Sequence, residues 1–506
     1  MTKTTAFTLS VTLALTVATP TITPNGGNFS GSVSVAMQTA TSGASIYYTT
    51  DGSTPSQSSQ LYTGAMNVTS DTTINAEAFK SGYNPSSVAS ASFTLAAIAQ
   101  STTGNAYYVA TNGSDSDSGT IKQPFRTIRQ GIASLAAGDT LYIRSGTYNE
   151  RIDGSTIPSG TGESNRTKIV AADGPGTVII FPMAVNNNGL LGWPNSGSFQ
   201  YITFDGIIFD GTNVVGVIGS DSMTQVIYIP GEASHLRFTN VEVRNGGMAN
   251  LNAQNTTTVG FTSSGSNVEF LNCHVHHNGL GPSSGPGSQG ARGYAWYIPG
   301  GSDILIDNCD VHDSGGYAVH SYSGTPHWPM RVTVRNSRFW GNGVVTAQFQ
   351  LTAAIRAINS TVYNNLVYNN GSIGIESVAG DTTSIIYNNT VYGNGSWGIL
   401  VSNAIVKNNI TYNNSLNRDG SADIGGFNLT GSVTSNNLCG QTYSTPGACA
   451  VVGNPKFVDT ATGDFHLQGG SPAIDAAVTL IEAATDIAGT PRPQGAAYDI
   501  GAFEYR

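Results

Sequence analysis

The chain has 506 residues and a formal net charge of −10, with only 10% charged residues, six lysines and 62 glycines. This length allows two or three domains, and the composition is typical of a turn-rich β protein. The charge balance argues against nucleic acid as a partner, because phosphate binding needs a basic surface. No apolar stretch is long enough to insert into a membrane as a helix.

Residues 1–16 have two interpretations. Lys3 precedes an apolar stretch, Ala6–Ala18, that resembles a secretory signal peptide. Alternatively, the segment Ala6–Leu9 (AFTL) echoes Ser92–Leu95 (SFTL), as the last strand of a preceding repeat would. Both interpretations imply a secreted or cell-surface protein.

Residues 17–97 are predicted to form a separate small β domain with strands over 32–35, 46–50 and 73–78. The phrase YYTTDGSTP at Tyr47–Pro55 contains an Asp-Gly hairpin signal. It resembles the chitobiase/hexosaminidase C-terminal module, an immunoglobulin-like β-sandwich. The resemblance implies an accessory role, because nothing in the segment supplies a nucleophile or a base.

Residues 98–105 are predicted to be a linker, and residues 106–150 open the next domain. This opening contains YYVATNGSD at Tyr107–Asp115 and a helix predicted over 126–135 from apolar spacing. It resembles the N-terminal cap of pectate-lyase-like right-handed β-helix proteins. Such a cap covers the open edge of the first coil.

A short phrase is repeated down the rest of the chain at intervals of 20 to 36 residues. Apolar residues alternate within each phrase, so the period is two and helical coils are excluded. Stacked repeats of this kind predict an all-β, parallel β-helix solenoid over residues 106–506, and the resemblance of the cap implies that the solenoid is right-handed. Weaker copies start at Asp205, Asn240 and Asn436, and clear copies start at Asn272, Asn308, Asn336, Asn364, Asn388 and Asn408.

The phrase also predicts which side chains face the core. The third residue after each anchor, from Ile208 in the first copy to Val391 in a late one, is expected to point inward. Stacked Asn365, Asn389 and Asn409 are expected to bond one another along the axis. Residues two and four positions after the anchor should then face solvent.

Ionisable residues gather in four consecutive coils of these outward columns, on a patch of roughly 15 Å by 7 Å. Such a patch matches a few sugar rings and predicts an active site. The first column is Ile207, Glu242, His274, Asp310, Arg338, Leu366, Thr390 and Ile410, and the second is Phe209, Arg244, His276, His312, Trp340, Tyr368, Tyr392 and Tyr412. The three tyrosines are interpreted as a structural stack on an exposed face or a distal sugar subsite.

A third column, twelve residues after the anchors, is predicted to contain His320, Gln348 and Glu376, followed by apolar Leu400. The neighbourhood of His320 and Glu376 is the alternative place for the active site. Segments 246–265, 279–292 and 323–329 are expected to project as loops that wall the site.

The four cysteines are expected to form two different pairs. Cys439 and Cys449 flank a loop that a disulfide could close. Cys273 and Cys309 share the inward register of adjacent coils and are expected to be free thiols.

Residues 455–506 are predicted to cap the other end of the solenoid. The phrases DFHL at Asp464–Leu467 and YDIGAFE at Tyr498–Glu504 resemble the terminal segment of secreted bacterial β-helix proteins. We interpret Asp475 and Asp499 as structural capping residues.

These resemblances imply a carbohydrate-active enzyme, either a polysaccharide lyase or a glycoside hydrolase. The paired aspartates and Gly-His-Gly of polygalacturonases do not occur, and neither Lys168 nor Lys407 fits the calcium-and-lysine site of family-9 pectate lyases. Catalytic residues therefore cannot be carried over from these families, and the candidates come from the columns.

The favoured function is a polysaccharide lyase that cleaves a uronate-containing glycan by β-elimination. His276 or His312 would be the base, Arg244 or Arg338 would neutralise the carboxylate, and Tyr297 or Tyr322 would protonate the leaving group. The other candidate catalytic residues are His274, Asp310, Glu242 and His320. The other candidate substrate-binding residues are Trp296, Arg292, Trp328, Trp340 and Glu376.

Three alternatives stay open. An inverting glycoside hydrolase could use Glu242 and Asp310, roughly 10 Å apart, and a glycan-binding or adhesin-like protein would need no catalytic group. Glu242 and three histidines could ligate a metal, but imidazoles on a flat sheet are not expected to converge. Cofactors are otherwise unknown, with calcium as one option. We expect a monomer whose partner is a polysaccharide.

Overall fold

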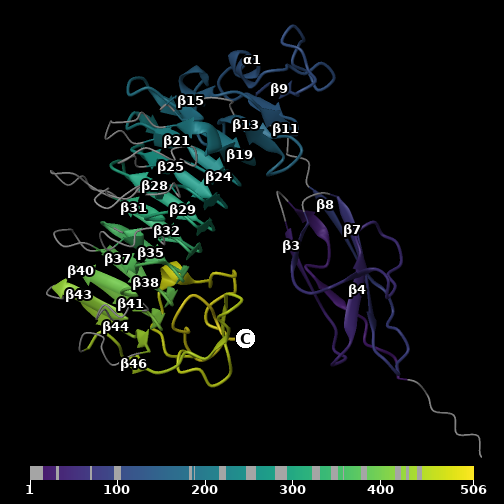
Figure 1. The fold of residues 1–506 in the computed structure, drawn as a ribbon, viewed down its shortest axis with the longest axis vertical. Coiled ribbons are helices and arrows are strands. Elements are labelled where there is room, and N and C mark those ends of the chain that lie inside the picture. Colours follow the sequence, from purple (N-terminus) through teal and green to yellow (C-terminus); the bar gives the residue numbers. More distant parts are fainter. Residues whose placement is uncertain are drawn as a thin grey trace, which may run out of the picture. The chain divides into compact units, whose positions relative to one another are not determined.

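The computed structural model divides the chain into two compact units, residues 1–100 and residues 101–506 (Figure 1). The predicted leader segment 1–16 and the predicted linker 98–105 lie almost wholly outside the described residues. The structure describes residues 15–29, 33–68, 71–95, 104–181, 185–186, 189–215, 224–246, 258–279, 293–321, 331–343, 352–356, 358–377, 384–415, 423–428, 432–440 and 447–506.

The first unit consists of two β-sheets around their own apolar core. The alternation along β7 (Thr72–Phe79) places Ile74, Ala76 and Ala78 inside. Tyr48 is buried in the same core, so it is not part of an exposed sugar-binding face. One sheet contains β1 (Thr21–Thr23), β3 (Val33–Gln38) and β6 (Met66–Val68), and the other β2 (Gly27–Phe29), β8 (Ala89–Leu95), β7, β4 (Ser45–Thr49) and β5 (Gln60–Leu61).

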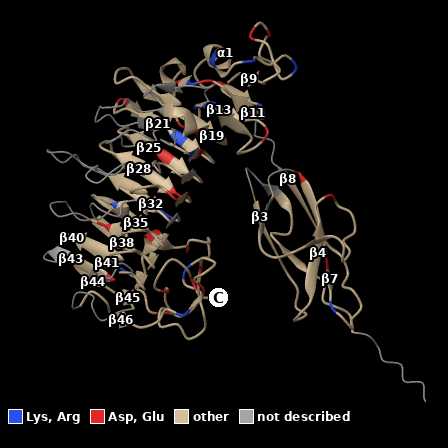
Figure 2. Cartoon of the chain, in the orientation of Figure 1, with Lys and Arg blue, Asp and Glu red and all other residues tan. Residues whose placement is uncertain are grey.

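The second unit is a parallel β-helix, as the repeats predict. Its coils stack through three parallel sheets of 12, 12 and 10 strands (Figure 1). Figure 2 shows how few charged residues these strands carry. Among the described residues, no helix has the length and apolar character that a membrane crossing requires.

The strands of each sheet follow one another in chain order. Sheet 1 contains β9 (Ala106–Val109), β10 (Thr140–Ile143), β13 (Thr167–Ala171), β18 (Ile202–Asp205), β23 (Arg237–Thr239), β26 (Glu269–Leu271), β29 (Ile304–Asp307), β32 (Val332–Arg335), β35 (Ser360–Tyr363), β38 (Ser384–Tyr387), β41 (Ala404–Lys407) and β44 (Val433–Ser435). Sheet 2 contains β11 (Gly146–Tyr148), β14 (Val178–Ile180), β19 (Ile207–Asp210), β24 (Glu242–Arg244), β27 (His274–His276), β30 (Asp310–His312), β33 (Arg338–Trp340), β36 (Leu366–Tyr368), β39 (Thr390–Tyr392), β42 (Ile410–Tyr412), β45 (Leu438–Cys439) and β46 (Val451–Val452). Sheet 3 contains β12 (Ile152–Asp153), β16 (Leu191–Gly192), β21 (Thr224–Ile229), β25 (Thr258–Ser263), β28 (Gly293–Ile298), β31 (Val319–Ser321), β34 (Ala353–Arg356), β37 (Ile373–Glu376), β40 (Ile399–Ser402) and β43 (Ile424–Asn428).

Shorter elements complete the fold. Strand β25 lies inside the predicted loop 246–265, so that prediction was wrong for residues 258–263, whose alternating residues pair with the neighbouring coils. The remaining elements are the pairs β15 (Val185–Asn186) with β20 (Val214–Val215), β17 (Phe199–Gln200) with β22 (Ala233–Ser234) and β47 (Phe457–Asp459) with β48 (Asp464–Leu467), the helix α1 (Ile128–Ala133), and the 3-10 turns η1 (Gly154–Thr156), η2 (Gly211–Asn213) and η3 (Ile481–Ala483).

The corner between sheets 1 and 2 explains why the repeated phrase begins with asparagine. The eight asparagine anchors from Asn240 to Asn436 have φ between 51° and 55°, a left-handed conformation that asparagine tolerates better than most residues. In the first copy this position belongs to Gly206, with φ of 75°, rather than to Asp205. The predicted columns are therefore wrong by one residue there, and Phe209 rather than Ile208 pairs with Val243.

Buried amides hold successive coils together inside this corner. Nδ2 of Asn365 donates to Oδ1 of Asn389, and Nδ2 of Asn389 donates to Oδ1 of Asn409, both at 3.0 Å. The predicted ladder is thus confirmed. A second, unpredicted ladder lies at the next corner and consists of Asn342, Asn370, Asn394 and Asn414, ending at Asp423.

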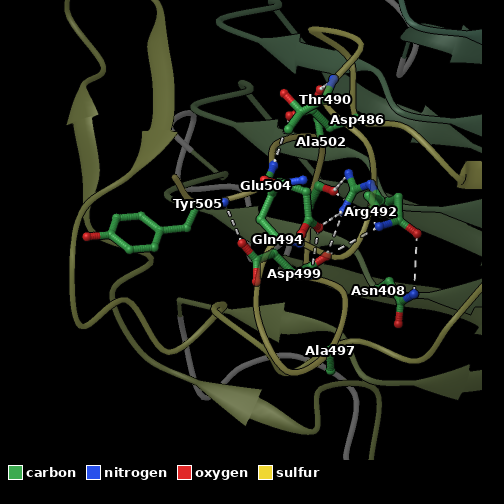
Figure 3. Close-up of polar contacts among 12 residues, drawn as sticks. Asn408, Asp486, Thr490, Arg492, Gln494, Ala497, Asp499, Ala502, Glu504 and Tyr505 are labelled. Carbon is green, nitrogen blue, oxygen red and sulfur yellow. Dashed lines mark hydrogen bonds and ion pairs between the residues drawn. The ribbon is translucent and has the colours of Figure 1, made fainter.

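Both ends of the solenoid are covered. Helix α1 packs Ile128 and Ile132 against the first coil, as its apolar spacing predicts. At the other end, a fully buried ion pair joins Nη1 of Arg492 to Oε1 of Glu504 at 2.7 Å (Figure 3). Asp499 accepts a hydrogen bond from the backbone N–H of Asp475, which agrees with its interpretation as a capping residue.

The cysteines behave as predicted. Cys439 and Cys449 form a disulfide whose Cα atoms are 5.8 Å apart. Cys273 and Cys309 are buried free thiols on adjacent coils.

We predict that Asn389→Ala lowers the free energy of unfolding by about 2–4 kcal/mol, because the carbonyls of Val362 and Tyr387 and the amides of two neighbouring coils lose their buried partner. Chemical denaturation of the purified chain measures this effect. The matched control is Thr361→Ala on the outer side of β35, expected to change stability by less than about 0.5 kcal/mol. Equal losses for the two variants would contradict a structural role for the ladder.

Candidate active site

Sheet 2 carries the predicted group of ionisable residues, and its strand register matches the predicted columns from Glu242 onward. The side chains of both rows point away from the core, because the residues between them, Val243, Val275, Val311 and Phe339, are buried. The first row is Glu242, His274, Asp310 and Arg338, and the second is Arg244, His276, His312 and Trp340. With Asp210, His277 and Asp313, these residues form one contiguous group, the histidine cluster.

The imidazoles of the cluster converge rather than spread over the sheet. Nε2 of His274 lies 2.7 Å from Nε2 of His312, and Nδ1 of His276 lies 2.6 Å from Nδ1 of His277. The rings of His276 and His312 are nearly parallel, with centroids 5.0 Å apart. The expectation that imidazoles on a flat sheet do not converge was therefore wrong, because side chains of adjacent coils lean toward one another.

Arg244 is held between two carboxylates. Its Nε lies 2.8 Å from Oδ2 of Asp210, and its Nη1 lies 2.8 Å from Oε1 of Glu242. Burial acts to raise the pKa of Glu242, yet hydrogen bonds from His276 and Arg244 outweigh it and hold that pKa below its ordinary value. Asp210 was missed by the sequence reading, because the first phrase starts at Gly206 and not one residue earlier.

Other polar groups of the cluster also form hydrogen bonds within it. Nδ1 of His312 bonds Oδ2 of Asp313 at 2.8 Å, and Nε1 of Trp340 donates to Oδ1 of Asp310 at 3.0 Å. Trp340 stacks on His312 at 4.2 Å, so it contacts the cluster itself. Burial and the nearby His276 lower the pKa of His274 to about 4, which leaves this imidazole neutral at neutral pH.

Beyond the cluster, the outer face of sheet 2 is covered. Phe465 packs against Tyr368 and Tyr392 at 5.0 Å and 5.3 Å, and Leu366 is fully buried beneath the C-terminal segment. The prediction that the tyrosine column lies on an exposed face was wrong. Residues 455–506 supply this cover, which the repeat pattern alone does not reveal.

Sheet 3 carries a second outward row. Its strand register places Tyr297 beside His320, His320 beside Arg356, and Arg356 beside Glu376. Sequence spacing placed Gln348 between His320 and Glu376, but Arg356 takes that position, and Gln348 lies outside the described residues. The uniform twelve-residue offset fails in this coil because the connection before β34 is longer.

Arg356 and Glu376 form a loose, half-buried pair. Nε of Arg356 lies 3.7 Å from Oε2 of Glu376, and Nη1 lies 3.5 Å from the hydroxyl of Tyr317. Nε of Arg356 and Oε2 of Glu376 are buried without a hydrogen-bond partner among the described residues. Burial raises the pKa of Glu376, although the charge of Arg356 opposes the shift. Because buried polar atoms are normally bonded, this pair indicates a place for a polar ligand.

Aromatic rings surround His320 on the same face. Its ring stacks on Tyr317 at 4.4 Å, with Tyr294 at 5.0 Å and Tyr297 at 5.4 Å. His320 is only 8% exposed. Three tyrosines, one histidine and the Arg356–Glu376 pair thus form a second group, the sheet 3 row.

Long connections border sheet 3, whereas two residues suffice between β29 of sheet 1 and β30 of sheet 2. Long segments beside a rigid sheet commonly build the walls of a binding site. The connections that enter β25, β28 and β34 comprise residues 245–257, 277–292 and 341–352.

Trp296 does not face a substrate. It is fully buried in the solenoid core and stacks on Phe261 at 5.5 Å, so its predicted role in substrate binding was wrong. Successive side chains of a strand point to opposite faces, and the next residue of β28, Tyr297, faces outward. Three further candidates, Arg292, Tyr322 and Trp328, lie outside the described residues.

Comparisons with known proteins agree with this architecture. The family described as Pel9A-like, right handed beta helix region, matches residues 107–413. The chain belongs to the Pel9A-like right-handed β-helix family. The family of the chitobiase/beta-hexosaminidase C-terminal domain matches residues 24–90, which confirms the predicted resemblance of the first unit.

Solved structures share the fold of this Pel9A-like chain at low identity. The crystal structure of pectate lyase Pel9A is 18% identical, with a TM-score of 0.53 over 79% of this chain and 96% of that chain. A rhamnogalacturonan lyase is also 18% identical, with a TM-score of 0.49 over 77% of this chain and 99% of that chain. The uncharacterized protein YwoF of Bacillus subtilis (strain 168) is 29% identical over 150 residues. That match spans 28% of this chain and only 29% of the relative's length.

We predict that Arg244→Met lowers the free energy of unfolding by about 1–3 kcal/mol, because it leaves the half-buried carboxylates of Asp210 and Glu242 without their shared cation. Urea titration of the folded chain measures the change. The control Arg338→Met removes an exposed guanidinium of the same sheet and should cost less than about 0.5 kcal/mol. Similar losses for both variants would show that Arg244 is not the electrostatic centre of the cluster.

Proposed function

We propose that the chain is an extracellular polysaccharide lyase that cleaves a uronate-containing glycan by β-elimination on the outer face of sheet 3. The observation that carries this proposal is the half-buried, incompletely bonded Arg356–Glu376 pair beside His320. Membership in the Pel9A-like family supports it. So does the shared fold with a protein named pectate lyase.

β-Elimination sets three tasks. A cation must neutralise the uronate carboxylate, a base must remove the neighbouring proton, and an acid must protonate the leaving oxygen. Arg356 is suited to the first task, because a guanidinium recognises a carboxylate with paired donors and its own contacts are long. We assign His320 as the base, since histidine titrates near neutral pH. Tyr317, between His320 and Arg356, is assigned as the acid.

Sheet 3 is preferred over the histidine cluster for a physical reason. In the cluster, Arg244 is already neutralised by Asp210 and Glu242, so a uronate carboxylate would have to displace one of them. Arg338 is exposed and therefore screened by water. Arg356 is half-buried, as Arg244 is, but its contacts with Glu376 and Tyr317 are longer, so its charge interacts more readily with a ligand.

The runner-up is a glycoside hydrolase, which needs two carboxyl groups, one of them a general acid. Glu242 suits that role poorly, because its pKa is held below the ordinary value. Glu376 has a raised pKa, as an acid requires. It is, however, the only carboxylate on the described strands β25 to β43 of sheet 3, so the second carboxyl group of a hydrolase is not apparent there.

We predict that Arg356→Met lowers kcat/KM at least about a hundredfold, because the variant cannot neutralise the substrate carboxylate. Activity is followed on a panel of polyuronates and neutral glycans by the ultraviolet absorbance of an unsaturated uronate product. The control Arg331→Met removes an exposed arginine of sheet 1 that pairs with Asp303 and should retain full activity. New reducing ends without absorbance would indicate the hydrolase, and glycan binding without products would indicate a binding module.

The panel also decides between the two faces of the solenoid. If the proposal is right, His312→Ala keeps turnover within a few-fold of wild type while His320→Ala loses it. The reverse pattern would place the active site in the histidine cluster, as the sequence columns first indicated.

We further predict that deleting residues 1–100 leaves kcat/KM on a soluble substrate unchanged within about twofold, because the two units are separately compact. Kinetics of the shortened and full chains on the same soluble substrate test this. Loss of turnover in a shortened chain that retains its β-sheet circular dichroism would assign the first unit a part in catalysis.

A further inference from the structure

Three side chains of the histidine cluster bring atoms that can bind a metal ion close together. Ring nitrogens of His274 and His276 and a carboxylate oxygen of Glu242 all lie within 4.8 Å of one another. Nε2 of His276 lies 3.2 Å from Oε1 of Glu242. Donor atoms bound tetrahedrally to zinc at about 2.0–2.1 Å lie roughly 3.3 Å apart. The edge between His276 and Glu242 therefore already has the length that a bound ion would impose.

Neighbouring residues hold these side chains in place. Nδ1 of His276 is engaged by His277 at 2.6 Å, which leaves Nε2 to face Glu242. His274 is held by His312, which is held in turn by Asp313. Metal-binding histidines commonly have such partners on the second ring nitrogen, which fix the tautomer and the ring orientation.

The charge of the cluster favours a cation. Four carboxylates, Asp210, Glu242, Asp310 and Asp313, face two guanidinium groups, Arg244 and Arg338. Arg244 contacts both Oε1 of Glu242 and Oδ2 of Asp210, so its single charge is shared between two carboxylates. Five of these residues lie on strands β19, β24, β30 and β33 of sheet 2, and Asp313 directly follows β30.

We propose that Glu242, His274 and His276 bind one divalent transition-metal ion of the zinc class on the outer face of sheet 2. Two imidazoles and one carboxylate suit zinc and its neighbours, whereas calcium and magnesium prefer all-oxygen ligands. The ion joins β24 to β27 and thereby ties two consecutive coils together. This inference is independent of the proposed lyase site, which lies on another sheet and uses other residues.

The test uses the full-length chain after treatment with a chelator and dialysis. Titration with Co²⁺ reports on the site through visible absorption, and calorimetry with Zn²⁺ gives stoichiometry and affinity. We expect one ion per chain and a higher midpoint of thermal unfolding with Zn²⁺ than without it. Ca²⁺ at the same concentration should give neither effect.

Variants locate the ion. His274→Ala and His276→Ala should each weaken Zn²⁺ binding at least tenfold and abolish the Co²⁺ absorption. The isosteric Glu242→Gln should weaken binding by a similar factor, and it keeps the test valid if a histidine variant fails to fold. His466→Ala, which removes an exposed histidine bonded to Asp464 in the C-terminal segment, is the control and should bind like wild type.

Two results would overturn the proposal. One is the lack of saturable Zn²⁺ or Co²⁺ binding by the folded wild-type chain. The other is undiminished binding by folded His276→Ala and Glu242→Gln variants, which would place the ion elsewhere. Lyase activity is not a readout in any of these measurements, so failure of the proposed function leaves the metal test unaffected.

Discussion

Each coil from β23 to β44 passes from sheet 1 to sheet 2 within two residues, and the first of these adopts a left-handed conformation. Asparagine meets this demand at low cost, and the amide that follows it in the later coils bonds the equivalent amide of the next coil. This corner sets the register of sheet 2, because each three-residue strand begins at a fixed distance from it. Rows of side chains that are distant in sequence thereby become neighbours in space.

That constraint explains how much of the molecule the sequence predicts. From Glu242 onward, the anchors give the inward valines, the asparagine ladder and the two outward rows of sheet 2 correctly. Prediction fails where the local rule changes. The first copy turns on Gly206 rather than asparagine, so its columns slip by one residue and Asp210 is missed.

Sheet 3 shows the opposite situation, because its strands follow connections of variable length. A distance of twelve residues from the anchor correctly places His320 and Glu376. The residue that lies between them in the sheet is Arg356, which only the pairing of β34 reveals. Trp296 and Tyr297 were both expected at the substrate, but only Tyr297 lies on the outer face, because successive residues of a strand point to opposite faces. Nor does local sequence reveal that the C-terminal segment covers the tyrosine column. Side-chain convergence in the histidine cluster likewise depends on rotamers that no spacing rule supplies.

The C-terminal segment, residues 455–506, packs as a tail against the outer face of sheet 2, so the number of coils beneath it and the length of this tail depend on each other. The corner amides of Asn364, Asn408 and Asn436 donate to backbone carbonyls of Thr485, Val478 and Ala476, respectively. Between Ala476 and Thr485 the tail therefore runs opposite to the order of these three coils. Gain of one coil between β36 and β45 by duplication would shift these amides by about 5 Å relative to the tail. Coil number in this part of the fold can change only when the tail changes with it, whereas coils nearer the N-terminus are free of that restriction.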